Sequence, residues 1–140
     1  MKLFVGVKAL ITRHDGKVLV VREATHYIDG EGCCPGEWDV VGGRIQPEET
    51  LLEGLQREIM EESGMRVRVG TIVGVAENFP TMKGEVVHII RVFYACSTEE
   101  SEVKLSSDHD AYEWISPTEQ TDLPLMENVA EMFKNYSKNL

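Results

Sequence analysis

The segment GRIQPEETLLEGLQREIMEESGM, residues 43–65, decides the fold because it contains a loop, a helix start and a helix stop. Thr50 followed three residues later by Glu53 is a capping box, in which the two residues satisfy backbone donors at a helix start. Gly64 readily adopts the left-handed conformation that ends a helix. We therefore predict a helix over about residues 51–63. Its apolar stripe consists of Leu51, Leu52, Leu55 and Ile59, with Gly54 allowing close packing against a sheet.

Three carboxylates crowd one patch of this predicted helix. Glu58, Glu61 and Glu62 stand at spacings of three and four, so they fall within about a quarter of the helix circumference. Crowded carboxylates raise one another's pKa unless a cation lies among them. Hard oxygen ligands suit Mg²⁺ or Mn²⁺ better than Zn²⁺, which favours Cys and His. The pattern therefore predicts a divalent metal site.

An ordinary solvated helix face is the alternative interpretation. Acidic runs on helices are usually exposed, and Glu53 with Arg57 at spacing four would form a common surface ion pair. That interpretation is favoured for any single glutamate. It does not account for the loop, the helix and the terminal glycine occurring together, so the whole pattern favours a site.

The same segment resembles the signature of a known family. Gly43, five residues, Glu49, seven residues and then REIMEESGM resembles an unbroken Nudix box. The flanking strands and the late segment DHDAYEW, residues 108–114, are also similar, so the resemblance extends over most of the chain. One departure is Val41, where the family usually has proline ahead of Gly42-Gly43. The resemblance implies a metal-dependent hydrolase that cleaves a diphosphate linkage attached to a nucleoside or similar group.

The resemblance also implies roles for individual residues. The implied metal ligands are Glu58, Glu61, Glu62 and the carbonyl of Gly43. Arg57 would orient Glu58, Glu49 would support the loop or the metal shell, and Gly42 would permit close backbone approach. The water would be activated by Glu58 or by an acidic residue of a later loop, for which Asp108 and Asp110 are the candidates. The predicted catalytic residues are therefore Arg57, Glu58, Glu61, Glu62 and Asp108.

Substrate contacts are predicted from the loops around the box. Residues 24–36 form a long Gly-rich loop, and such loops often lie near the substrate in this family. Arg22 and Arg44 are candidate phosphate contacts, although solvation at the surface is the alternative for each. Phe79 is a candidate for stacking on a base. Trp38 and Trp114 share that hypothesis, and core or loop packing is the alternative for all three aromatic residues.

Hydrophobic periodicity predicts the remaining elements. Strands are expected at residues 3–11, 17–23, 38–41, 67–76, 86–97 and 112–116. Pro124 is expected to open a final amphipathic helix, and His88 is interpreted as a hydrogen-bonded core histidine. This order predicts one α/β domain over residues 1–140, with a central mixed β-sheet between helices. The Nudix resemblance implies the same α/β/α sandwich.

Composition restricts the partners and the compartment. The 14 basic and 24 acidic residues give a net charge of −10, which is unfavourable for binding polymeric nucleic acid. A nucleotide would also be repelled unless metal ions bridge its phosphates to the carboxylates. No run of about 18 apolar residues is present, so no membrane partner is expected. The quaternary structure is expected to be a monomer or a homodimer.

Three cysteines, Cys33, Cys34 and Cys96, cannot all pair, and none has the two-residue spacing of a zinc site. This usage favours a reducing compartment, and we expect a cytoplasmic protein. Cys96 ends an apolar run and is expected to be a small buried residue. The role of the adjacent Cys33 and Cys34 stays open.

Three hypotheses for the activity follow. Compact members of the family, the MutT-like group, more often hydrolyse nucleoside triphosphates to the monophosphate and pyrophosphate. Pro80 stands fifteen residues after the box, as in ADP-ribose pyrophosphatases, so ADP-ribose or another nucleoside diphosphate conjugate is the alternative substrate. A non-catalytic nucleotide-binding module is a third hypothesis. The intact glutamate set argues against it, because a binder has little use for clustered carboxylates.

Overall fold

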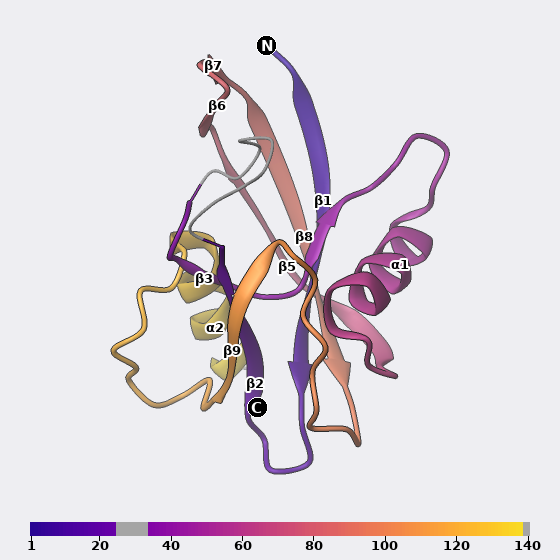
Figure 1. The fold of residues 1–140 in the computed structure, drawn as a ribbon, viewed down its shortest axis with the longest axis vertical. Helices are drawn as coiled ribbons and strands as arrows, with labels where there is room; N and C mark the ends of the chain where they lie inside the picture. Colours follow the sequence, from indigo (N-terminus) through magenta and orange to yellow (C-terminus); the bar gives the residue numbers. More distant parts are fainter. Residues whose placement is uncertain (25–33, 139–140) are drawn as a thin grey trace.

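The computed structural model describes residues 1–24 and 34–138 as one sheet between two helices (Figure 1). The elements are β1 (Leu3–Thr12), β2 (Val18–Glu23), β3 (Trp38–Asp39), β4 (Gly42–Arg44), α1 (Leu51–Ser63), β5 (Arg68–Asn78), β6 (Thr81–Met82), β7 (Glu85–Val86), β8 (His88–Ser97), β9 (His109–Ile115) and α2 (Glu127–Lys138). None of the helices in these two ranges has the length and apolar character needed to cross a membrane.

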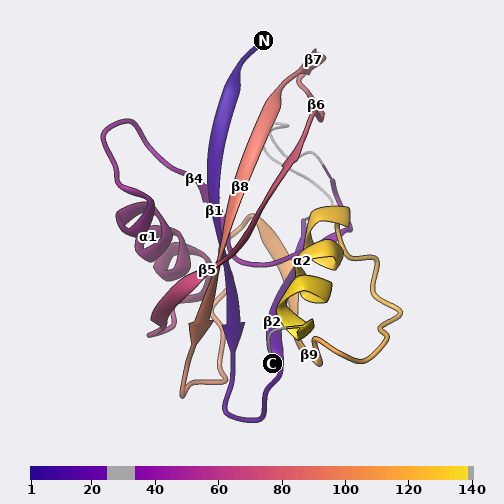
Figure 2. The same ribbon diagram turned by 180° about the vertical axis from the view of Figure 1, so that it is seen from behind.

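The described strands form a sheet in the order β3-β2-β1-β8-β5, with β4 added to β1 and β9 added to β2. β1 pairs in parallel with β8 along its whole length, whereas its pairings with β2 and β4 are antiparallel. The two helices lie on opposite sides of this sheet (Figures 1 and 2). The prediction of an α/β/α sandwich with a mixed sheet is therefore confirmed. β6 and β7 form a separate two-stranded hairpin.

Alternation along β1 separates the two sides of the sheet. Val7, Ala9 and Ile11 are buried in the core on the side of α1, together with Leu55. Leu10 belongs to the second core, on the side of α2. A strand buried on both faces in this way holds the two layers together, because successive side chains point in opposite directions.

The predicted limits of α1 agree with the structure. Thr50 and Glu53 form both hydrogen bonds of the capping box, and Gly64 ends the helix with φ 66°. The side chain of Glu53 thus accepts from the backbone of Thr50 at 3.2 Å, whereas the expected surface partner, Arg57, pairs with other carboxylates. One residue of the predicted apolar stripe, Leu52, is half exposed.

The final helix begins later than predicted. Pro124 does not open α2; its carbonyl accepts the backbone N–H of Trp38 at 2.9 Å. The carbonyl of Trp38 in turn accepts the N–H of Met126, so this segment extends the sheet edge before α2 starts at Glu127. Trp38 itself is buried in the core beside α2, which overturns its proposed role in stacking on a base.

Other differences concern strand ends and one loop. β9 begins at His109, three residues earlier than expected, because it continues to pair with β2 as far as Glu23. β5 continues to Asn78 along β8. The expected strand over residues 38–41 is shortened to β3, residues 38–39, and the separate strand β4 follows at residues 42–44. Cys96 is buried as expected, whereas Cys33 and most of the loop over residues 24–36 lie outside the described residues.

Candidate functional site

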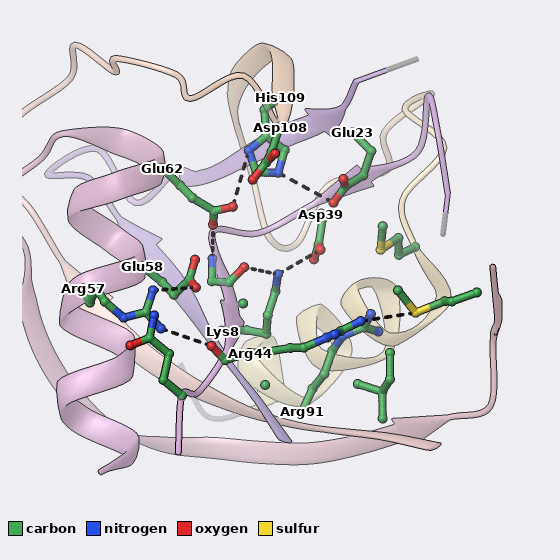
Figure 3. A pocket seen from close by; sticks show the side chains of 17 residues that line it. Lys8, Glu23, Asp39, Arg44, Arg57, Glu58, Glu62, Arg91, Asp108 and His109 are labelled. Atoms are coloured by element: carbon green, nitrogen blue, oxygen red, sulfur yellow. Dashed lines mark hydrogen bonds and ion pairs between the residues drawn. The ribbon is translucent and has the colours of Figure 1, made fainter. Parts of the chain in front are cut away.

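A pocket of about 370 Å³ lies where the middle of β1, strand β4 and the second half of α1 meet. Figure 3 shows the carboxylates of Glu58 and Glu62 on one side of Lys8, and the side chains of Arg44 and Arg91 on the other. The pocket therefore has an acidic end and a basic end. Of the predicted site residues, it is lined by Gly42, Gly43, Arg44, Arg57, Glu58, Glu62 and Asp108.

Arg57 connects α1 to the loop before it. Its guanidinium binds the carboxylate of Glu49 through two hydrogen bonds, of 2.7 and 3.0 Å. The same group donates to Glu58 at 3.0 Å, to Glu61 at 3.1 Å and to the carbonyl of Arg44 at 3.1 Å. Hydrogen bonds from Arg57 and from a backbone N–H lower the pKa of Glu49 to about 2. The guanidinium group of Arg57 thus fixes the loop at Glu49 and the end of β4 at Arg44 relative to α1.

Glu58 lies against Gly43. A Cβ on Gly43 would stand 2.8 Å from the carboxylate carbon of Glu58, so the missing side chain provides the space that this carboxylate occupies. Burial raises the pKa of Glu58, and the ion pair with Arg57 only partly opposes that effect. Glu61 differs, because its side chain is 56% exposed and does not line the pocket.

Glu62 is the most shielded of the three clustered carboxylates of α1. Its Oε1 accepts the backbone N–H of Gly42 at 2.6 Å, and the residue is buried. Burial raises the pKa of Glu62 to about 7, although the charges of Lys8 and His109 oppose this. A carboxylate with such a pKa exchanges a proton near neutral pH unless a cation stabilises its charged form.

Lys8 is buried on the floor of the pocket. Its ammonium group donates to Asp39 at 2.9 Å and to the carbonyl of Gly42 at 3.0 Å. A lysine is almost never fully buried without a partner, and this one compensates Asp39 while placing positive charge near Glu58 and Glu62. In the sequence this lysine only interrupts an apolar strand.

His109 lies between two carboxylates at the acidic end. Its Nε2 is 3.6 Å from Glu23 and its Nδ1 is 3.7 Å from Glu62. The buried Nδ1 has no hydrogen-bond partner within the described ranges. Burial lowers the pKa of His109, but the two nearby carboxylates outweigh it and the net shift is upward. The neighbouring Asp108 is exposed and lines the pocket, which is where the predicted late acidic residue is needed.

Two predicted substrate contacts do not line this pocket. Arg22 pairs with Asp110 at 2.6 Å, on the surface. Phe79 is exposed and stacks on His88 with ring centroids 4.3 Å apart. His88 also binds Glu77 at 2.8 Å and is partly exposed, so the interpretation as a core residue was wrong although the hydrogen bond was expected.

Sequence reasoning missed several lining residues because long-range pairing brings them to the pocket. They are Gly6, Lys8, Glu23, Asp39, Gln46, Met82, Ile89, Arg91, His109 and Met126. Two signals were available. Lys8 is a charged residue inside an apolar strand, and His109 stands within the segment that resembles the family's late acidic stretch.

The chemistry of the donors fits a hard divalent ion. Glu58 and Glu62 are shielded carboxylates, and burial of their charge is a cost that a divalent cation would relieve. Residues 1–24 and 34–138 contain no group of three or more His, Cys, Asp or Glu side chains already gathered for a metal. Arg57 holds Glu58 and Glu61 instead. The assignment of the metal ligands therefore stays a prediction.

Known proteins resemble this chain along its length. The model of the NUDIX domain matches residues 2–136. A MutT-like protein of Streptomyces ambofaciens is 30% identical over 129 residues, which cover 92% of this chain and 71% of that protein. Nucleoside triphosphatase NudI of Escherichia coli (strain K12) is 27% identical over 114 residues, covering 76% of this chain and 78% of NudI. The crystal structure of a MutT protein from Methanosarcina mazei Go1 has a TM-score of 0.83 at 27% identity, covering 99% of this chain and 95% of that one.

Proposed function

The chain belongs to the NUDIX family, and from that premise we propose that it hydrolyses a nucleoside triphosphate to the nucleoside monophosphate and pyrophosphate. The observation that carries the proposal is the pair of shielded carboxylates, Glu58 and Glu62, facing a pocket whose other end is basic. Both ends of the pocket suit a polyphosphate. The acidic end would bind its phosphates through metal ions, and the basic end would bind them directly through arginine side chains. The similarity to nucleoside triphosphatase NudI supports this choice of substrate.

Mg²⁺, with Mn²⁺ as a substitute, is the proposed cofactor. Glu58, Glu62 and the carbonyl of Gly43 would hold it, with Glu61 as a further ligand. When bound there, it would neutralise charge on the phosphoryl oxygens and polarise a water molecule.

The chain's own residues position the reactants. Arg57 fixes Glu58 beside Gly43, and Glu49 fixes Arg57. Glu58 and Asp108 both line the pocket, and they are our candidates to accept the proton of the attacking water. Asp110 is a weaker candidate because Arg22 pairs with it. Residues 1–140 would act as one domain in this reaction.

The deciding experiment compares kcat/KM for canonical and oxidised nucleoside triphosphates with kcat/KM for ADP-ribose and nucleotide sugars, all with Mg²⁺. We expect at least a tenfold preference for a triphosphate, with pyrophosphate and the nucleoside monophosphate as products. A tenfold preference for a diphosphate conjugate, about 1.4 kcal/mol of transition-state discrimination, would reverse the ranking.

The Glu58→Gln variant, purified in the same way, controls for contaminating hydrolases. Its turnover should fall by orders of magnitude under the same conditions. A wild-type protein that binds triphosphates but shows no more turnover than Glu58→Gln would support the binding-module hypothesis instead.

A further inference from the structure

Two arginines stand beside the same glycine on the pocket floor. Gly6 of β1 is the register partner of Arg44 on β4 and also of Arg91 on β8. Directly paired residues of neighbouring strands project from the same face of a sheet. Arg44 and Arg91 therefore flank Gly6 on one face, and both line the pocket.

Gly6 has no side chain to fill the pocket floor between Arg44 and Arg91. A Cβ at this position would lie 3.5 Å from the carbonyl oxygen of Gly43 and 3.7 Å from the Cγ of Arg91, which is ordinary contact. The α-carbons of the two arginines are two strand spacings apart, roughly 10 Å. Two arginine side chains that start this close on one face can both reach an anion bound over Gly6.

Neither arginine is neutralised by an acidic side chain within the described ranges. The Cζ of Arg44 lies 3.8 Å from the ring centroid of Phe4, and its guanidinium donates weakly to the sulfur of Met82. Arg91 has no ion pair with any residue in 1–24 or 34–138. By contrast, Arg57 binds three carboxylates. Two unpaired guanidinium groups in a chain with a net charge of −10 indicate a site for an external anion.

We propose that Arg44 and Arg91 form an anion subsite over Gly6 that binds the pyrophosphate portion of the substrate. The identity of the anion rests on the proposed function. Figure 3 shows both arginines on the side of Lys8 away from Glu58 and Glu62. Lys8 does not compete for the anion, because it is bound to Asp39 and to the Gly42 carbonyl. Arg91, which no sequence motif indicated, thereby becomes a residue that binds the phosphate groups of the substrate.

Calorimetric titration with inorganic pyrophosphate in the presence of Mg²⁺ tests this subsite directly. In Arg91→Gln, the Kd for pyrophosphate should rise by roughly 10- to 100-fold, as expected for lost charged hydrogen bonds. Arg91→Lys should recover part of the loss. The matched control is Arg68→Gln, an exposed arginine of β5 that pairs with Ser97 at the other end of the sheet, and its Kd should stay within twofold of wild type.

Two further measurements separate binding from folding. Gly6→Ala removes no charge but covers the floor with a methyl group, and it should weaken pyrophosphate binding severalfold. The affinity of Arg91→Gln for a nucleoside monophosphate should equal that of wild type. A pyrophosphate Kd for Arg91→Gln within twofold of wild type, or an equal loss for pyrophosphate and the monophosphate, would overturn the subsite.

The titration requires no turnover, so its outcome is independent of the substrate ranking. If the wild type prefers diphosphate conjugates while Arg91→Gln still loses pyrophosphate, the proposed function fails and the subsite stands. If triphosphates are preferred but Arg91→Gln binds pyrophosphate normally, only the subsite fails. With triphosphates as substrate, Arg91→Gln should raise KM more than it lowers kcat.

Discussion

The ammonium group of Lys8 lies 2.9 Å from Oδ2 of Asp39, and both side chains are almost completely buried. The same ammonium group also holds the carbonyl of Gly42, so one cation joins β1, β3 and the start of β4. The pocket floor is therefore built around an internal ion pair. Removing one member of such a pair leaves the other charge buried and uncompensated.

Lys8→Met should destabilise the fold by about 3–5 kcal/mol, because Asp39 is left as an unpaired buried charge. Urea unfolding at neutral pH measures the loss. The control is Lys17→Met, which removes an exposed lysine near the turn before β2 and should change the unfolding free energy by less than about 0.5 kcal/mol. A loss below about 1 kcal/mol in Lys8→Met would show that Asp39 does not depend on this partner.

Glu62 should make the stability of the metal-free protein depend on pH. Burial raises its pKa from 4.5 to about 7, so between these values the folded state binds a proton that the unfolded state has lost. The contribution of Glu62 to stability therefore falls as pH rises through this window. In EDTA, the unfolding free energy of Glu62→Gln minus that of wild type should increase on the order of 3 kcal/mol from pH 4.5 to 7.5.

Glu61→Gln is the matched control for that series, because its carboxylate belongs to the same helix but is mostly exposed. Its difference from wild type should stay nearly constant over the same range. A flat or falling difference for Glu62→Gln would contradict the raised pKa. Glu62 contributes to the upward pKa shift of His109, so the difference between Glu62→Gln and wild type includes the effect of losing this interaction.

Mg²⁺ should raise the melting temperature of the wild-type protein, because a ligand that binds only the folded state stabilises it by mass action. Glu58→Gln should lose most of this shift and lower turnover by orders of magnitude while its circular dichroism spectrum is unchanged. Glu113→Gln, on the exposed side of β9, serves as the control. Near-normal activity of Glu58→Gln at saturating Mg²⁺, or wild-type turnover after exhaustive chelation, would refute the metal assignment.

Gly42 and Gly43 should respond differently to alanine. At Gly42, with φ 137°, a Cβ would lie within 2.9 Å of three backbone atoms of Val7 and Lys8, so Gly42→Ala should unfold the protein or cost several kcal/mol. At Gly43 the three atoms nearest to such a Cβ all belong to the carboxylate of Glu58, the end of a side chain, and none of them is a backbone atom. Gly43→Ala should therefore keep its thermal stability and lose activity. Equal stability of the two variants would contradict the close approach at Gly42.

Local signals in the sequence were enough to predict the limits of α1, whereas the roles of Glu49 and Arg57 were implied by the Nudix resemblance. Thr50, Glu53 and Gly64 act on backbone groups within a few residues, so their pattern specifies the helix limits without knowledge of the fold. The spacing from Glu49 to Arg57 likewise lies within one loop and two helical turns. Such contacts between residues close in the sequence do not depend on how the rest of the chain folds.

Long-range relationships could not be predicted in the same way. Lys8 meets Asp39 across 31 residues, and only strand register brings Arg91 beside Gly6. Proline favours the first position of a helix, but this rule gave the wrong start for α2 at Pro124. The backbone of Pro124 and Met126 instead pairs with Trp38, which is a tertiary interaction. The carboxylates of α1 and Arg44 were thus predicted from the sequence, whereas Lys8 on the pocket floor and Arg91 at the basic end were not.

Successive side chains of β1 face opposite sides of the sheet, and this affects which substitutions the protein can accept. Val7, Ala9 and Ile11 pack in the core on the side of α1, whereas Gly6 lines the pocket, and the atoms nearest to a Cβ there would belong to Gly43 and Arg91. In the proposed subsite, substrate preference and folding are thus encoded at neighbouring but separate positions of one strand. A combinatorial library restricted to position 6 and its two arginine partners would sample new substrate preferences while the scaffold stays fixed.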